Sequence, residues 1–220
     1  MKKNEKFSFF WQIWGFIREN MILLKHRKVA DFWNPAIRAY FEGKIEKNYF
    51  TPLKEFPEEK RIIWQYWGQG VDQIALPEVV RDCFTSVDKY KGEYEVMRLC
   101  DDTVEDYITL PDFIWEKRKN GQLSVTFFSD LLRLVLLHTY GGVWLDATIL
   151  LTGTLPEEYT GLDYFVFQRD NNEENRSKVE SPISRYWGWK LGFKVKMLNS
   201  IIFAKKNNEV IQVLMDLLLY

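Results

Sequence analysis

Three charged residues lie in the most apolar part of the chain. Asp130 and Arg133 stand three positions apart at the start of a segment that is otherwise apolar up to residue 137, and Asp146 follows the apolar run 143–145. A charge within an apolar segment is costly unless it has a partner. Helical spacing puts Asp130 and Arg133 on one face. They form either a structural ion pair beside a turn aspartate or the polar part of a binding site.

The sequence around these residues predicts a helix, a glycine stop and a strand. Ser129 can accept a hydrogen bond from a free N–H of the first turn, which predicts that the helix begins there. Gly141 and Gly142 can adopt the left-handed conformation that closes a helix, and residues 143–145 then form a core strand. Asp146 therefore follows the carboxyl end of a strand, where open α/β sheets bind ligands.

Strands alternate with helices through the rest of the chain, which predicts an α/β fold with a mostly parallel sheet and helices on both faces. Two helices, at 7–25 and 31–49, and a linker at 51–57 precede it. The predicted organisation is an N-terminal helical extension over 1–57 and an α/β domain over 58–220. The last helical pattern has no stop signal, so we expect truncation at the C-terminus. The other predicted strands are 61–67, 94–99, 148–151, 164–167 and 200–204.

Composition excludes several classes of function. The net charge of −1 provides no field that would attract nucleic acid. Two cysteines, Cys83 and Cys100, are too few for a disulfide framework or a zinc site, and they fit a reducing, cytoplasmic setting. The chain has no GxGxxG after its first strand and no P-loop motif, which argues against dinucleotide-binding and P-loop enzymes. His138 falls in the last turn of the central helix, where a cation interacts favourably with the helix dipole, and we assign it a structural role.

The first predicted helix is rich in aromatic and apolar residues, but charged residues interrupt it. It is therefore not a membrane span, and it lacks the cleavage site of a signal peptide. The basic cluster 25–28 follows it. Residues 7–28 form either a helix packed on the domain or a peripheral contact with a membrane interface. The expected location is the cytoplasm, including the inner face of a bacterial membrane.

The central stretch resembles the signature of a known family. Ser129-Asp130-Leu131-Leu132-Arg133, followed after seven residues by Gly141-Gly142-Val143-Trp144-Leu145-Asp146-Ala147-Thr148, resembles the "SDxxRxxxLxxxGGxYxDxD" pattern of GT-A sugar transferases with an Asp-x-Asp motif. The capsular polysaccharide synthesis branch matches best. Weaker blocks at 62–68, 107–111 and 198–204 extend the resemblance over about residues 58–215. It implies a GT-A-like, Rossmann-like fold.

The resemblance also implies roles for individual residues in binding a nucleotide-diphosphate sugar. Trp67 matches the aromatic residue that stacks on the base, and Asp130 and Arg133 match the pair that holds the nucleoside and donor. Gly142 falls within the same donor-binding block. Asp146 matches the first acid of the motif, which touches the ribose and the metal and is the expected catalytic residue.

The motif departs from the family pattern at its second acid, because Thr148 stands there. Hard cations accept hydroxyl as well as carboxylate oxygens. The resemblance therefore implies Mn²⁺ or Mg²⁺ held through Asp146 and Thr148, with other ligands from phosphate and water. The implied activity is retaining transfer of a hexose, expected from a UDP-sugar, to a bacterial capsular or surface glycan acceptor. The alternatives are a non-catalytic nucleotide- or glycan-binding module of a synthesis complex and a peripheral membrane protein.

Several residues keep two interpretations each. Trp67 is either the stacking residue or part of the core, and Asp101 and Asp102 are either turn residues or donor ligands. Asn199 and Ser200 either cap the following element or contact the donor. The run 186–189 is either an acceptor-sugar platform or packing at an edge.

Overall fold

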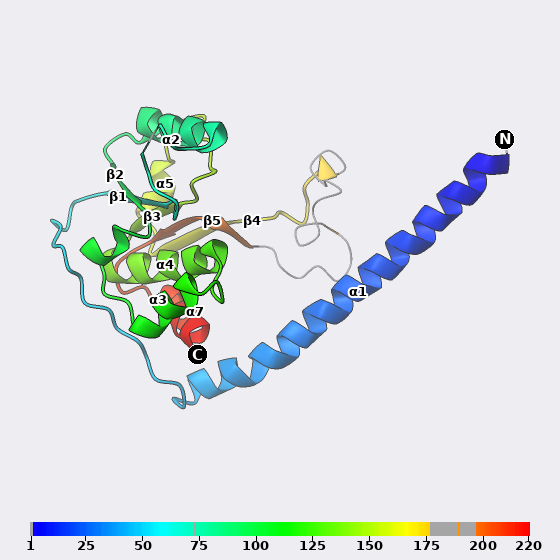
Figure 1. Cartoon of the computed structure of the whole chain (residues 1–220), viewed down its shortest axis with the longest axis horizontal. Coiled ribbons are helices and arrows are strands. Elements are labelled where there is room, and N and C mark those ends of the chain that lie inside the picture. Colours follow the sequence, from blue (N-terminus) through cyan, green and yellow to red (C-terminus); the bar gives the residue numbers. More distant parts are fainter. Residues whose placement is uncertain (1, 73, 177–188, 190–196) are drawn as a thin grey trace. The chain divides into compact units, whose positions relative to one another are not determined.

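The computed structural model describes residues 2–72, 74–176, 189 and 197–220 (Figure 1). It divides into two compact units. The first comprises Met1–Lys44 and Gln168–Met197, and the second comprises Ile45–Phe167 and Leu198–Tyr220. Of the candidate acceptor platform at 186–189, all but Trp189 lies outside the described residues.

A single helix, α1 (Lys2–Phe41), replaces the two helices expected in the N-terminal region. No glycine or proline interrupts residues 26–30, and the basic residues there are good helix formers, so the helix continues through them. Pro35 lies inside the helix without ending it. Within the described part of the chain, no helix has the length and apolar character needed to cross a membrane.

The second unit is built on a five-stranded sheet with the order β2-β1-β3-β5-β4. Strand β1 pairs in parallel with β2 and with β3, whereas β5 pairs antiparallel with β3. The sheet is therefore mixed rather than parallel throughout, and the α/β fold class is confirmed. The strands are β1 (Ile62–Tyr66), β2 (Glu95–Leu99), β3 (Gly142–Leu145), β4 (Tyr164–Gln168) and β5 (Met197–Ala204).

The expected strand at 148–151 is absent. A turn follows β3 instead, closed by a 2.9 Å hydrogen bond from the Ile149 N–H to the Asp146 carbonyl oxygen. Ile149 and Leu151 pack against the core without joining the sheet, whereas Leu150 is exposed. The apolar character of the segment alone therefore led to the wrong prediction of a strand.

Side chains alternate between the two covered faces of the sheet, as strand geometry requires. Trp64, Trp144 and Ile202 join one apolar cluster, while Val143 and Phe203 join another. The first face packs against α3, α4 and α7, and α2 and α5 cover the second (Figure 1). These helices are α2 (Glu78–Tyr90), α3 (Asp112–Lys119), α4 (Val125–Tyr140), α5 (Glu157–Thr160) and α7 (Glu209–Leu219), with a short 3₁₀ helix, η1, at Val104–Asp106.

Helix α4 begins earlier than its sequence pattern indicated. Ser124, not Ser129, is its N-cap, and the Ser124 hydroxyl accepts a hydrogen bond from the Phe127 N–H at 3.2 Å. Ser129 is inside the helix, where its hydroxyl lies 3.5 Å from an Nη atom of Arg133. The helix ends as expected at Gly141, whose φ of 74° lies in the left-handed region.

Residues 45–57 belong to the α/β unit rather than standing apart from it. The buried carboxylate of Asp216 accepts hydrogen bonds from the Asn48 N–H and from Gln212 Nε2 at 2.7 and 2.9 Å. His138 is buried in the same region, and burial lowers its pKa although the nearby Asp216 charge opposes this. The neutral imidazole is therefore favoured, so the buried His138 fits the structural role assigned to it but not the interaction of a cation with the helix dipole.

We expect Gly142→Ala to lower the free energy of unfolding by about 1–3 kcal/mol. Gly142 has a φ of 107°, and a β-carbon there would lie 2.5 Å from the backbone carbonyl oxygen of Ile62. Gly153→Ala is the matched control, because a β-carbon at that position meets nothing within 4 Å. Urea unfolding of both variants measures the effect, and equal stabilities would contradict the close approach of β3 to β1.

Candidate functional site

The guanidinium of Arg133 links two carboxylates that are distant in the sequence. Its Nη2 atom lies 2.9 Å from Oδ1 of Asp130 and 3.2 Å from Oδ1 of Asp146. The Arg133 side chain is 5% exposed, against 26% for Asp130 and 29% for Asp146. We call these three residues the arginine cluster. Both carboxylates thus share one buried cation and keep part of their surface open to solvent.

Neighbouring groups fix the geometry of the arginine cluster. Trp144 Nε1 donates a 2.6 Å hydrogen bond to Oδ1 of Asp146, and the Arg133 guanidinium lies 5.3 Å from the centroid of the Trp144 ring. Asn199 contributes from β5, since its carbonyl oxygen accepts from Arg133 and its side-chain amide donates to Oδ1 of Asp130 at 3.1 Å. The cluster is therefore held by α4, β3 and β5 together.

Both acids of the cluster have pKa values above those of ordinary aspartates. For Asp130, burial raises the pKa, the Arg133 charge opposes the rise, and the Asp146 charge adds to it. For Asp146, burial also raises the pKa, against the opposing effects of Arg133 and the Trp144 hydrogen bond. One guanidinium thus does not fully compensate two partly buried carboxylates, and this favours binding of a further cation or of hydroxyl donors.

Oδ1 is the oxygen of each carboxylate that makes the closest contacts. In the part of the chain that the structure describes, the hydrogen bonds to Asp130 and Asp146 fall on Oδ1, and each ion pair with Arg133 has its closest approach there. Among the described residues, none hydrogen-bonds to Oδ2 of either acid. The two Oδ2 atoms are therefore the positions from which the site can accept hydrogen bonds from sugar hydroxyls or coordinate a metal ion.

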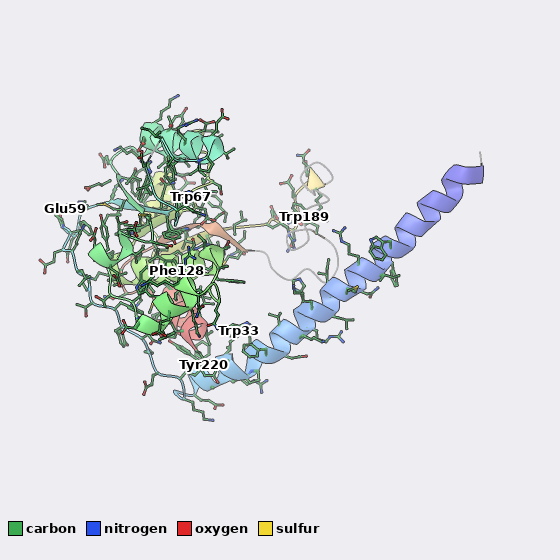
Figure 2. The ribbon with its side chains drawn as sticks, viewed as in Figure 1. Trp33, Glu59, Trp67, Phe128, Trp189 and Tyr220 are labelled. Atoms are coloured by element: carbon green, nitrogen blue, oxygen red, sulfur yellow. The ribbon has the colours of Figure 1, made fainter. Side chains whose placement is uncertain are left out.

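Trp67 directly follows β1, beyond its carboxyl end (Figure 2). It is half-buried and packs on a small apolar cluster that includes Phe84 and Ala147. Ala147 directly follows Asp146, so the indole and the arginine cluster share the carboxyl edge of the parallel strands. The ring contributes to packing and is also partly exposed, so both interpretations of Trp67 stay open.

Gly142 does not join the other candidate residues. It is the first residue of β3, whereas Asp146 follows the last. The space where its side chain would stand is occupied by the β1 backbone. A cavity of about 860 Å³ lies at this amino-terminal edge, with Gly142 and Tyr140 in its lining, and it does not include Asp146.

Thr148 is exposed in the turn that follows Asp146. Asp146 and Thr148 could supply one carboxylate oxygen and one hydroxyl oxygen to a divalent cation. Within the described residues, no group of three His, Cys, Asp or Glu side chains could hold a metal ion. Mg²⁺ and Mn²⁺ prefer about six oxygen ligands, so these residues fit an ion that brings most of its ligands with it, as phosphate oxygens and water.

Sequence reasoning missed Trp144 as a partner of Asp146 and left Asn199 undecided. The spacing of Trp144 and Asp146 could have indicated this contact, because residues two apart in an extended segment point to the same face. Nothing in the sequence could pair Asn199 with Asp130, since that contact depends on the antiparallel addition of β5 beside β3.

Comparison with known proteins places this chain in a family. The family model described as "Capsular polysaccharide synthesis protein" matches residues 13–220. The chain is 30% identical over 106 residues to "Glycosyltransferase afumC" of Aspergillus fumigatus (strain CBS 144.89 / FGSC A1163 / CEA10), covering 44% of this chain and 27% of that relative. The chain thus spans about a quarter of the length of this curated relative.

Among solved structures, the chain is similar to "PaToxG Glycosyltransferase" with 15% sequence identity and a TM-score of 0.40, over 89% of this chain and 67% of that one. The family match covers nearly the whole chain, including α4, β3 and the arginine cluster. The chain therefore belongs to the capsular polysaccharide synthesis protein family.

Proposed function

We propose that this chain is the donor-binding part of a glycosyltransferase that moves a hexose from a nucleotide-diphosphate sugar, specifically a UDP-sugar, to a bacterial capsular or surface polysaccharide. The observation that carries the proposal is the arginine cluster at the carboxyl edge of β3, with Trp67 packed against the apolar cluster that contains Ala147, the residue after Asp146. Family membership supports the same activity, as does the similarity to a fungal protein named as a glycosyltransferase.

Each residue has a role that its chemistry permits. The exposed part of the Trp67 indole stacks on the nucleobase. Asp130 and Asp146 accept hydrogen bonds from ribose or sugar hydroxyls through their available Oδ2 atoms. Arg133 holds both carboxylates at a fixed separation, so the acceptors are oriented before the donor binds.

We propose that Mn²⁺ or Mg²⁺ binds together with the donor diphosphate, held by Asp146 and Thr148. When bound, the cation stabilises negative charge on the departing diphosphate. Asp146 is the residue of this chain that orients the ion, while Arg133 keeps its carboxylate in place. Because the protein offers so few ligands of its own, affinity for the cation alone should be weak.

A non-catalytic nucleotide-binding module is the second candidate. The observation that favours it is Thr148, which replaces the second acid and leaves Asp146 without a carboxylate partner in its turn. Such a module would bind UDP or a glycan within a synthesis complex without turning it over. Binding and turnover must therefore be measured separately.

The test combines calorimetric titration of UDP, with and without Mn²⁺, and a transfer or hydrolysis assay with UDP-, GDP- and CMP-sugars. We expect UDP to bind at least about tenfold more tightly with Mn²⁺, because the ion bridges Asp146 and the diphosphate. Turnover of a UDP-sugar is expected. Binding without turnover would favour the module, and the absence of nucleotide binding would contradict both candidates.

The cytoplasmic location and the peripheral membrane contact of residues 7–28 stay predictions. Large apolar side chains are exposed on α1, among them Trp14, Phe16 and Met21, ahead of the basic cluster at 25–28. Aromatic and basic residues in one helix are typical of segments that lie in a lipid interface. Flotation of the chain with anionic liposomes, compared with a variant lacking residues 1–30, tests this contact.

A further inference from the structure

Asp101 makes contacts that a simple turn residue does not make. Its Oδ1 accepts a short hydrogen bond from the hydroxyl of Tyr66, and its Oδ2 lies 2.9 Å from Nη2 of Arg118. Its backbone N–H donates to the carbonyl oxygen of Gly68 at 3.4 Å. Asp101 therefore contacts both chain neighbours of Trp67, one through its side chain and the other through its backbone.

The backbone of Trp67 itself is also tied to β2. Its N–H donates a 2.9 Å hydrogen bond to the carbonyl oxygen of Leu99, which continues the β1–β2 pairing beyond the last strand residue. Three consecutive residues, from Tyr66 to Gly68, are thus held by the end of β2. The position of the indole depends on these contacts as much as on its own packing.

Gly68 leaves the space that the Tyr66 hydroxyl needs. A β-carbon at Gly68 would lie 2.6 Å from the phenol oxygen of Tyr66 and 3.2 Å from a methyl group of Val125. Val125 is the first residue of α4, the helix that carries Asp130 and Arg133. The tyrosine hydroxyl therefore sits in a close-packed position between the Trp67 segment and the start of that helix.

We infer that Tyr66, Asp101 and Arg118 form a positioning clamp that sets the orientation of Trp67 for nucleotide stacking. The Asp101 carboxylate contacts Tyr66 through one oxygen and Arg118 through the other, and in this inference it acts on the site through these contacts. The Arg118 guanidinium donates through Nη2 to Asp101 Oδ2 at 2.9 Å, and its Nε has no hydrogen-bond partner among the described residues. This inference rests on the proposed function, because the test by nucleotide affinity requires that the chain binds a nucleotide.

The protonation state of Tyr66 fits this role. Burial raises the pKa of its hydroxyl, and the hydrogen bond to Asp101 and the charge of Asp101 raise it further, against the opposing effects of Arg118. The phenol therefore remains a donor throughout the neutral and mildly alkaline range. The clamp does not open by titration of Tyr66 under ordinary conditions.

The first measurement uses the nucleotide-free protein. In Tyr66→Phe, amide hydrogen exchange at Trp67 should accelerate at least about tenfold, because the Asp101 contact that holds the segment is lost. Tyr107→Phe is the matched control, since its hydroxyl contacts Met97 Sδ at 3.6 Å and not Asp101. Unchanged exchange at Trp67 in Tyr66→Phe would overturn the clamp, whatever the nucleotide results.

The second measurement is a double-mutant cycle on UDP affinity. Tyr66→Phe should raise the Kd for UDP about tenfold, the factor expected from one lost hydrogen bond to a charged acceptor, with a smaller change in kcat. In a Trp67→Ala background the same substitution should have no further effect, because the clamp acts through the indole. A full effect that persists without Trp67 would overturn the inference.

The two measurements separate the failure of the clamp from the failure of the proposed function. If exchange at Trp67 accelerates but the wild-type chain binds no nucleotide, the proposed function fails and the clamp stands as a device that orders Trp67. If UDP binds and neither exchange nor affinity responds to Tyr66→Phe, the clamp fails alone. Asp101→Asn, which keeps the shape of the side chain but not its charge, must give the same direction of change as Tyr66→Phe.

Discussion

Asp146→Asn is expected to lower the turnover of a UDP-sugar by about 100-fold or more while leaving the chain folded. The asparagine oxygen can still accept the hydrogen bond that Trp144 donates to Oδ1, so the local structure is retained. The amide has no charge, however, and cannot replace the Oδ2 atom in holding a cation or a ribose hydroxyl. Losses of two to three orders of magnitude are typical when one electrostatic contact to a transition state is removed.

The stability of Asp146→Asn should be equal to or greater than that of the wild type at pH 7. Burial raises the folded-state pKa of Asp146 above its unfolded value. The contribution of Asp146 to stability is therefore present below its unfolded-state pKa and is lost as the pH rises through its folded-state pKa. At pH 7 the ionised carboxylate consequently destabilises the folded protein. Asp163→Asn is the control, because that carboxylate is 80% exposed and pairs with Lys205 on the surface.

Wild-type turnover in Asp146→Asn would contradict the site assignment.

The central block could be predicted from the sequence because it is local. The apolar run before Gly141 and the short apolar run before Asp146 predicted α4, its stop and β3, and the structure confirms the order of these elements. The spacing of Asp130 and Arg133 also predicted that they share one helix face, and the structure pairs them. Periodicity, glycine and charge spacing act within a few residues, so one stretch of sequence contains the whole signal.

Features that depend on distant segments could not be predicted in the same way. Whether Arg133 would reach Asp146 depends on how α4 packs on β3, and the part played by Asn199 depends on the antiparallel placement of β5. The role of Asp101 was obscured for a similar reason, because Tyr66 and Arg118 approach it from two other elements. The N-cap of α4 was placed late because Ser124 and Ser129 are both acceptable caps, and only packing decides between them.

Arg133→Met is expected to be the most destabilising single change in the site, by about 3–5 kcal/mol at pH 7.5, the usual loss when one partner of a buried ion pair is removed. The substitution leaves Asp130 and Asp146 ionised, partly buried and without their shared cation. It also removes the donors that contact the carbonyl oxygens of Ser129 and Asn199. Urea unfolding monitored by tryptophan fluorescence measures the loss.

The pH dependence of the stability loss in Arg133→Met shows how much of that loss is electrostatic. Without the guanidinium, the folded-state pKa values of Asp130 and Asp146 rise further, since Arg133 is the charge that opposes the effect of burial in both. The folded variant then binds protons more readily than the unfolded chain, so its stability increases as the pH falls through these raised pKa values. The difference from wild type should therefore be smaller at pH 4.5 than at pH 7.5.

Arg61→Met is the matched control for this dependence, because Arg61 is 38% exposed and pairs with Glu157 on the surface. A surface pair contributes little to stability, so this variant should remain close to wild type at both pH values. A loss in Arg133→Met that is the same at pH 4.5 and 7.5 would mean that packing, not charge, explains the need for arginine. The two carboxylates would then have no excess negative charge with which to bind a cation or hydroxyl donors, and the proposed donor site would lose its main electrostatic support.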